Sequence, residues 1–276
     1  MYPNYPDYYK ISAEDLSKNA RTPILVLADA GEVYYELAYE MLCEIEKHNA
    51  EGRKTVFICP FGPFRQYPIF ARLVNERRVS LKNTWFINMD EYLTDDGEWV
   101  DESDPLSFRA GMKAQLYSRL DPELIMPEEQ RIFPDPHDPG AIQRLIDALG
   151  GVDIAMGGIA VNGHIAFNEP QPELSVEAFG QLPTRIVRLS AETRLKNAIL
   201  DRGGAYDTMP NLCITVGMKE LFAARKMRLT MTLDMQRSVI RRAAHGEVTS
   251  AFPISYAQRH PNALLIISAN VAEKPF

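Results

Sequence analysis

Short apolar runs alternate with longer segments whose apolar residues recur at helical spacing, and this pattern extends over most of the chain. The short runs predict eight strands, at residues 24–28, 55–59, 84–88, 152–156, 185–189, 212–216, 228–233 and 263–267. The longer segments predict six helices, at residues 31–47, 64–76, 106–118, 141–149, 191–200 and 235–245. Such alternation is typical of a parallel sheet with helices on both faces. We therefore expect a doubly wound, Rossmann-like three-layer α/β fold.

The first 22 residues do not share this alternation and are expected to form an N-terminal arm. Residues 23–276 are expected to form one α/β catalytic domain, because a chain of this length with 46% hydrophobic residues can bury a sizeable core. Residues 93–105 and 122–140 are rich in Pro, Asp and Glu, and we interpret them as loops.

The charge balance and the hydropathy exclude several classes of partner. The net charge is −7 and no basic run occurs, so neither nucleic acid nor a membrane surface is expected as a partner. No apolar run approaches the roughly 18 residues that span a bilayer. The N-terminal sequence has neither the basic nor the apolar region of a secretory signal. We expect a cytoplasmic protein.

The cysteines and histidines give no indication of a metal centre. Cys43, Cys59 and Cys213 lie in apolar stretches without metal-ligand spacing and are expected to be reduced core residues. The five histidines do not cluster, and no HxxH or CxxC pair occurs. We expect neither a metal nor a cofactor.

The residues that indicate chemistry follow two of the predicted strands. After the run at 152–156, residues 157–170 read Gly-Gly-Ile-Ala-Val-Asn-Gly-His-Ile-Ala-Phe-Asn-Glu-Pro and bring together Asn162, His164 and Glu169. Ligands of open α/β sheets bind at the carboxyl ends of the strands, so this loop is a predicted site. The alternative is a strand-to-helix turn whose glycines only relieve steric clashes.

The second stretch is Trp-Phe-Ile-Asn-Met-Asp-Glu-Tyr at residues 85–92, an apolar strand that ends in two acids. Asp90 is a candidate general base at this strand end. The alternative is an N-cap for the next helix, but the polar residues after Tyr92 show no immediate helical pattern.

Residues 88–92 (Asn-Met-Asp-Glu-Tyr) and 163–170 (Gly-His-Ile-Ala-Phe-Asn-Glu-Pro) resemble the two signature segments of the glucosamine-6-phosphate deaminase (isomerase) family. The wider superfamily also holds the 6-phosphogluconolactonases. Further segments resemble the family in the same order, at residues 104–108, 190–194, 215–217 and 253–261. The resemblance runs from about residue 23 to about residue 269, and the Phe-Asn-Glu-Pro ending favours the deaminase branch.

The resemblance implies catalytic roles. Asp90 matches the family's proton shuttle between adjacent carbons, His164 the acid/base that opens the sugar ring, and Glu169 the carboxylate that orients this histidine. Asn162 stands where the family usually has an aspartate. An amide orients an imidazole but does not stabilise its charged form, so we expect Asn162→Asp to raise activity.

The resemblance also implies an anion site, in which Gly62 and Gly158 are expected to bind substrate. Arg194 matches a lid arginine that grips phosphate, and Arg237 stands where the family has a phosphate-binding lysine. The family's Gly-Gly-Ser/Thr-Pro turn is replaced here by Pro-Phe-Gly-Pro-Phe at residues 60–64, which removes a hydroxyl and an amide donor. Arg65 adds a cation after this turn, so we expect three guanidinium groups around one anion.

By resemblance, the protein is an enzyme, a hydrolase that isomerises and deaminates a phosphorylated amino sugar, and a homo-oligomer is expected. Two alternatives stay open at this point. One is a sugar-phosphate lactonase, which needs water activation by His164 but no carbon-acid base. The other is a non-catalytic homologue that binds a sugar phosphate, with Asn162 as the mark of lost catalysis.

Overall fold

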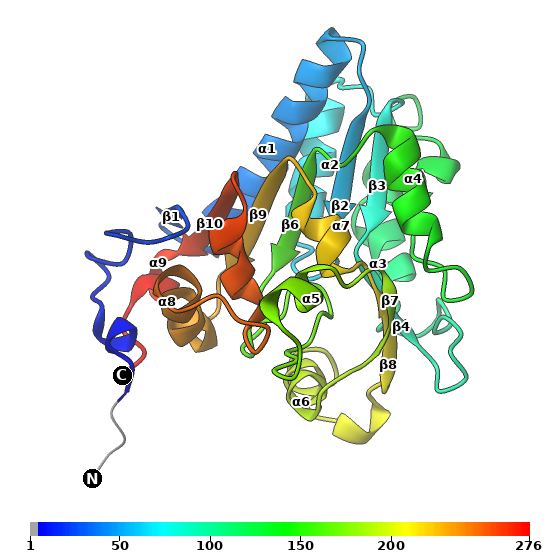
Figure 1. The fold of residues 1–276 in the computed structure, drawn as a ribbon. Helices are drawn as coiled ribbons and strands as arrows, with labels where there is room; N and C mark the ends of the chain where they lie inside the picture. Colours follow the sequence, from blue (N-terminus) through cyan, green and yellow to red (C-terminus); the bar gives the residue numbers. More distant parts are fainter. Residues whose placement is uncertain (1–4) are drawn as a thin grey trace.

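Seven parallel strands form the central sheet of the computed structural model, which describes residues 5–276 (Figure 1). Their order is β1-β10-β9-β6-β2-β3-β5, and every neighbouring pair is parallel. The strands are β1 (Ile24–Leu27), β2 (Thr55–Cys59), β3 (Thr84–Asn88), β5 (Arg131–Ile132), β6 (Ile154–Gly158), β9 (Lys226–Met231) and β10 (Ala263–Ser268). The expected mostly parallel sheet is confirmed.

Helices cover both faces of this sheet because successive strand residues point to opposite sides. Val56 and Ile58 of β2 belong to one hydrophobic cluster, and Phe57 and Cys59 belong to another. The second cluster is closed by α1 (Ala30–Ala50), α2 (Gln66–Arg77) and α3 (Phe108–Gln115). The first is closed by α4 (Ala141–Leu149), α7 (Met218–Phe222), α8 (Arg237–His245) and α9 (Ala269–Ala272). The result is the expected three-layer sandwich.

Three strands form a separate antiparallel sheet in the order β4-β8-β7. They are β4 (Asp90–Leu93), β8 (Leu212–Thr215) and β7 (Arg185–Arg188). The sequence predicts strands at the positions of β8 and β7, which is correct. Their expected place in the parallel sheet is wrong. Burial alternates along β7, as it does in a sheet with one covered face.

The remaining helices lie near this second sheet or connect elements. They are α5 (Val176–Gly180) and α6 (Ala191–Asp201), with short 3-10 turns at η1 (Asp7–Lys10), η2 (Tyr117–Arg119), η3 (Glu128–Gln130), η4 (Tyr206–Thr208), η5 (Asp234–Gln236) and η6 (Pro253–Arg259). Ser190 caps α6, because its hydroxyl accepts a hydrogen bond from the backbone N–H of Thr193. Within residues 5–276, no helix combines the length and the apolar character that a membrane crossing requires.

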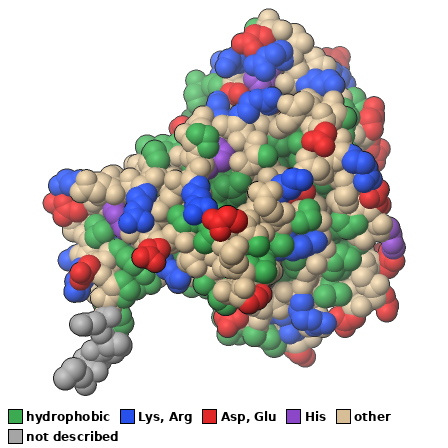
Figure 2. Space-filling view, viewed as in Figure 1, with side chains coloured by type: hydrophobic (Ala, Val, Ile, Leu, Met, Phe, Trp, Pro, Cys, Tyr) green, Lys and Arg blue, Asp and Glu red, His purple; other side chains and the backbone are tan. Residues whose placement is uncertain are grey.

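The N-terminal segment packs on α8. Leu16 is fully buried in the first cluster, and its carbonyl lies 2.8 Å from Nε2 of His245. Arg241 donates from Nε to the carbonyl of Ile11 at 3.0 Å. Residues 1–4 of the expected arm lie outside the described residues. On the face shown in Figure 2, acidic and basic side chains are interspersed.

Candidate active site

A cavity of about 520 Å³ opens beyond the carboxyl ends of β2 and β6. These strands are neighbours in the sheet although three other strands separate them in sequence, so the cavity lies at a topological switch point, where open α/β sheets bind ligands. Gly62 and Gly158 both line the cavity, and the N–H of Gly158 donates to the carbonyl of Gly62 at 3.2 Å. A Cβ at position 158 would lie 2.6 Å from that carbonyl oxygen, so the close approach of the two loops requires glycine.

Asp90 lines the same cavity and is 7% exposed. It is the first residue of β4, directly after the chain crosses from the parallel sheet to the antiparallel one at Met89. Burial raises the pKa of the Asp90 carboxyl well above its usual range, and the negative charge of Glu91 raises it further. The carboxyl forms no hydrogen bond with another described side chain, which leaves it available to a ligand.

Glu91 has a different role from its neighbour. Its fully buried carboxylate accepts hydrogen bonds from the backbone N–H groups of Phe108 and Arg109, at 3.0 and 2.9 Å, and from the hydroxyl of Ser107. These donors are the first turn of α3, whose N-terminal amides need acceptors. The N-cap of α3 is Ser107, whose side chain accepts from the N–H of Ala110, and Glu91 stabilises the same turn from the neighbouring strand.

His164 is held by a polar network on one side of its ring. Nδ1 lies 3.4 Å from Oε2 of Glu169 and 3.2 Å from the hydroxyl of Thr193. Asn162 donates from Nδ2 to the same Oε2 of Glu169 at 2.7 Å and accepts from the backbone N–H of His164 at 3.2 Å. A proton on Nδ1 allows the ring to donate a hydrogen bond to Glu169. Nε2 is then the nitrogen that can exchange a proton with a ligand.

The Glu169 carboxylate is strongly stabilised in its charged form. Burial raises its pKa, but the hydrogen bond and positive charge of His164 outweigh this, and with bonds from Thr193 and the Ser190 backbone they lower the pKa to about 2. Glu169 is therefore ionised at neutral pH and accepts a hydrogen bond from Nδ1 of His164. The structure thus brings Asn162, His164 and Glu169 into direct contact at the cavity.

The three arginines predicted to surround an anion do not line this cavity. Arg65 is exposed at the N-cap of α2. Arg194 stacks 4.5 Å from the ring centre of Tyr206 and donates to the carbonyl of Met209 at 3.1 Å. Arg237 donates to the carbonyl of Asn270 and pairs with Asp234. Their expected role in phosphate binding stays a prediction.

Further residues line the cavity. One wall is aromatic, since Phe61 stacks on Phe64 with ring centres 5.3 Å apart and contacts Phe108. Lys196 and Asn197 of α6 also line it. The spacing of Thr193 and Lys196, three residues apart on one helix, is the signal that could have placed this lysine near His164.

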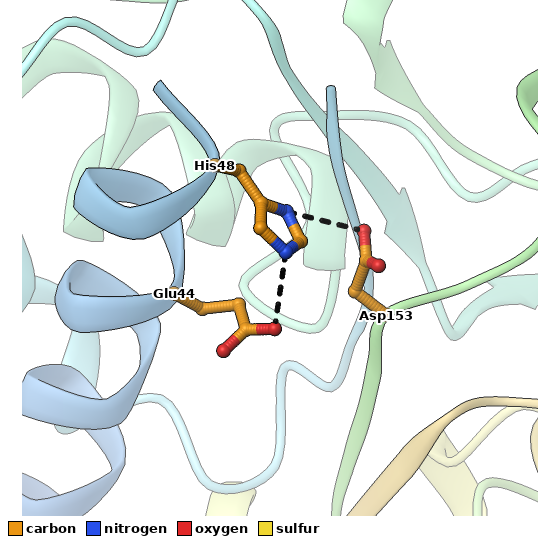
Figure 3. Close-up of side chains that lie close together, drawn as sticks. All are labelled: Glu44, His48 and Asp153. Carbon is orange, nitrogen blue, oxygen red and sulfur yellow. Dashed lines mark ion pairs between the residues drawn. The ribbon is translucent and has the colours of Figure 1, made fainter. Parts of the chain in front are cut away.

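Among the described residues, one group could ligate a metal by its composition (Figure 3). It lies at the end of the sheet opposite the cavity, because Asp153 directly precedes β6. It comprises Glu44, His48 and Asp153, whose ligand atoms lie within 4.8 Å of one another. The carboxylate oxygens of this group already accept hydrogen bonds from other protein groups. Asp153 accepts from the Val56 N–H and from Arg225, both at 2.8 Å, and Glu44 accepts from Lys226 at 2.7 Å. Two cations beside the group disfavour a bound metal ion, so we interpret it as a buried ion-pair network.

Comparison with known proteins shows related enzymes. The chain is 34% identical over 214 residues to the glucosamine-6-phosphate deaminase of Shewanella loihica, with 75% of this chain and 74% of the relative covered. It is 30% identical over 213 residues to the same enzyme of Hahella chejuensis, with coverages of 75% and 76%. No family model matches the chain.

Solved structures show the same fold. A monomeric glucosamine-6-phosphate deaminase superposes with a TM-score of 0.79 at 22% identity and covers 91% of this chain and 98% of its own. The 6-phosphogluconolactonase of Leishmania guyanensis superposes with a TM-score of 0.63 at 14% identity, with coverages of 91% and 98%. With relatives of at least 30% identity aligned over about three quarters of both chains, this protein belongs to the glucosamine-6-phosphate deaminase family.

Proposed function

We propose that the protein isomerises and deaminates a phosphorylated amino sugar, so that a 2-amino-2-deoxy-aldose phosphate and water become a ketose phosphate and ammonia. The observation that carries this proposal is the presence of two different proton-transfer groups in one cavity. Asp90 is buried and forms no hydrogen bond with a side chain of residues 5–276, whereas the ring of His164 is held by the ionised Glu169.

The two groups suit two successive steps. His164 gives a proton to the ring oxygen while the bond from C1 to this oxygen breaks, and the proton of the C1 hydroxyl returns to the imidazole, so that the ring opens to an aldehyde. Asp90 then removes the proton from C2 and returns it to C1, while a proton passes from the amino nitrogen to the oxygen on C1. The double bond thereby moves from C1–O to C2–N. Water adds to the resulting imine at C2, and the nitrogen leaves as ammonia.

The environment of Asp90 supports its part in this chemistry. A carboxylate in water is a weak base for a carbon-bound proton, and burial strengthens it by raising its pKa. The base must be ionised to act, so activity should rise with pH through the pKa of Asp90.

A lactonase is the alternative enzyme, and it is supported by the fold of the 6-phosphogluconolactonase structures alone. Hydrolysis of a lactone needs a group that activates water but no base for a carbon acid. A non-catalytic binder needs neither group. Burying the Asp90 carboxyl without a hydrogen-bonding side chain among the described residues costs free energy of folding. Neither a lactonase nor a binder gives a functional reason for this cost.

The test is ammonia release, coupled to an ammonia-consuming reporter, across amino-hexose 6-phosphates, their N-acetyl forms and the non-phosphorylated amino sugars. We expect ammonia and ketose phosphate in equal amounts from at least one amino-hexose 6-phosphate. Hydrolysis of a sugar-phosphate lactone without any ammonia release would support the lactonase instead.

We also propose a cytoplasmic, homo-oligomeric protein. One structural neighbour is a monomeric deaminase, so the oligomeric state is a separate question from the activity. Light scattering during size-exclusion chromatography would determine it, and a mass of about one chain would contradict the proposal.

A further inference from the structure

The cavity contains one lysine or arginine among the residues that line it, and this residue is Lys196 of α6. The other charged lining groups, apart from His164, are the carboxyls of Asp90 and Asp201. A cavity that receives an anionic substrate needs a cation to compensate the charge.

Two of the three arginines expected at the anion site already form contacts within the protein, and the third, Arg65, is exposed and does not line the cavity. Arg194, two residues before Lys196 on the same helix, donates to the Tyr206 hydroxyl and to the Met209 carbonyl. Arg237 donates to the Asn270 carbonyl and pairs with Asp234 at 3.2 Å. These contacts hold both side chains, and neither guanidinium lines the cavity, so either arginine would have to reorient to reach an anion there.

Lys196 differs in that its ammonium forms neither an ion pair nor a hydrogen bond with any residue between 5 and 276. The side chain is half-buried, and burial lowers the pKa of its ammonium, although Asp201 opposes this. Leaving a partly desolvated cation without a partner is costly, and a bound anion would remove that cost.

Helix α6 also fixes where Lys196 lies relative to the reaction. The hydroxyl of Thr193 lies 3.2 Å from Nδ1 of His164, and Asn197 donates a hydrogen bond to the hydroxyl of Tyr92 at 2.8 Å. Lys196 is three residues beyond Thr193, so it is one turn further along the cavity wall. A substrate whose ring atoms meet His164 would place a more distant substituent beside Lys196.

On these observations, we propose that Lys196 is a specificity-determining residue that binds the anionic substituent of the substrate. This inference rests on the proposed function for the identity of the substrate, but the binding role can be tested without turnover. The occupant is a phosphorylated sugar whose phosphate contacts the ammonium and whose carbon skeleton packs against the wall of Phe61, Phe64 and Phe108.

The experiment is calorimetric titration with a hexitol 6-phosphate, which cannot isomerise because it has no carbonyl group, and with the unphosphorylated hexitol. The variants are Lys196→Met, which keeps the length and helix propensity, and Lys196→Arg, which keeps the charge. Lys82→Met is the matched control, because Lys82 is an exposed lysine just before β3, at the end of the sheet opposite the cavity. Thermal melts establish that each variant is folded.

We expect Lys196→Met to weaken hexitol 6-phosphate binding by about 10- to 100-fold, because one charge-assisted hydrogen bond is lost. Binding of the hexitol should not change, Lys196→Arg should recover most of the loss, and Lys82→Met should behave as wild type. Unchanged affinity of folded Lys196→Met for the phosphate, or an equal loss for both ligands, would overturn the inference. Lys196-dependent binding without ammonia release from any amino sugar phosphate would refute the proposed function and leave this inference standing.

Discussion

Asn162 donates a hydrogen bond of 2.7 Å from its amide nitrogen to Oε2 of Glu169, the oxygen that also faces Nδ1 of His164. The amide is therefore a donor to the carboxylate as well as an acceptor for the His164 backbone. An aspartate at this position would keep the acceptor but lose the donor. Two carboxylates would then face each other across a hydrogen-bond distance.

This geometry reverses the expectation that Asn162→Asp raises activity. Repulsion between the two carboxylates should raise the pKa of Glu169 from about 2 and disturb the hydrogen bond between Glu169 and Nδ1 of His164. We expect kcat for ammonia release at neutral pH to fall roughly 10-fold. The matched control is Asn211→Asp, since Asn211 donates to Asp95 at 2.9 Å on the exposed surface. Equal or higher activity of Asn162→Asp, with the control at wild-type level, would contradict this account.

The buried carboxyl of Asp90 should lower stability as pH rises. Its pKa is raised in the folded protein, so the carboxyl is protonated in both states below about pH 4, and above this only the unfolded chain ionises fully. The unfolding free energy should therefore fall with pH, at up to about 1.4 kcal/mol per pH unit, until the folded pKa is reached. Asp90→Asn should remove this fall in the unfolding free energy, because the amide does not ionise.

Urea denaturation between pH 4 and pH 8 would measure the effect. Asp90→Asn should equal the wild type near pH 4 and become the more stable protein as pH rises. Asp153→Asn is an informative contrast, because both oxygens of Asp153 accept hydrogen bonds and this variant should lose stability. A constant difference between Asp90→Asn and wild type over the pH range would show that the Asp90 carboxyl ionises normally.

Glu91 should matter for stability and for the position of α3. Glu91→Gln places an amide donor against the donors of Ser107 and Arg109, and it leaves at least one buried N–H without an acceptor. We expect a loss of about 1–3 kcal/mol, which thermal or urea unfolding would detect.

Glu102→Gln is the matched control for this change. Glu102 also pairs with Arg109, at 3.6 Å, but its side chain is 52% exposed, so its neutralisation should cost less than about 1 kcal/mol. Similar losses in both variants would show that the ion pair with Arg109, and not the cap of α3, is what Glu91 contributes.

The parts of the fold that local pattern determines could be predicted from the sequence. The runs at residues 55–59 and 141–149 became β2 and α4 with the predicted ends, because each has a continuous apolar pattern and clear flanking breaks. The short helix α5 was missed because its five residues are too few for a helical repeat to be recognised.

Features that depend on distant contacts could not be predicted. β4 pairs with β8, more than 100 residues away, so the chain's crossing at Met89 has no local signal. The motifs did place Asp90 and His164 at one cavity, because both follow strand ends at one edge of the sheet. The direction of an arginine side chain, by contrast, is decided by partners such as Tyr206 that spacing does not reveal.

The most direct test of the central claim is ammonia release from glucosamine 6-phosphate by wild-type protein and by Asp90→Asn. If Asp90 moves the proton between C2 and C1, the variant should lose about 10²- to 10⁴-fold in kcat while its affinity for hexitol 6-phosphate stays close to wild type. Wild-type kcat in the Asn variant would contradict the account, because the carbon-bound proton would then be removed by another group.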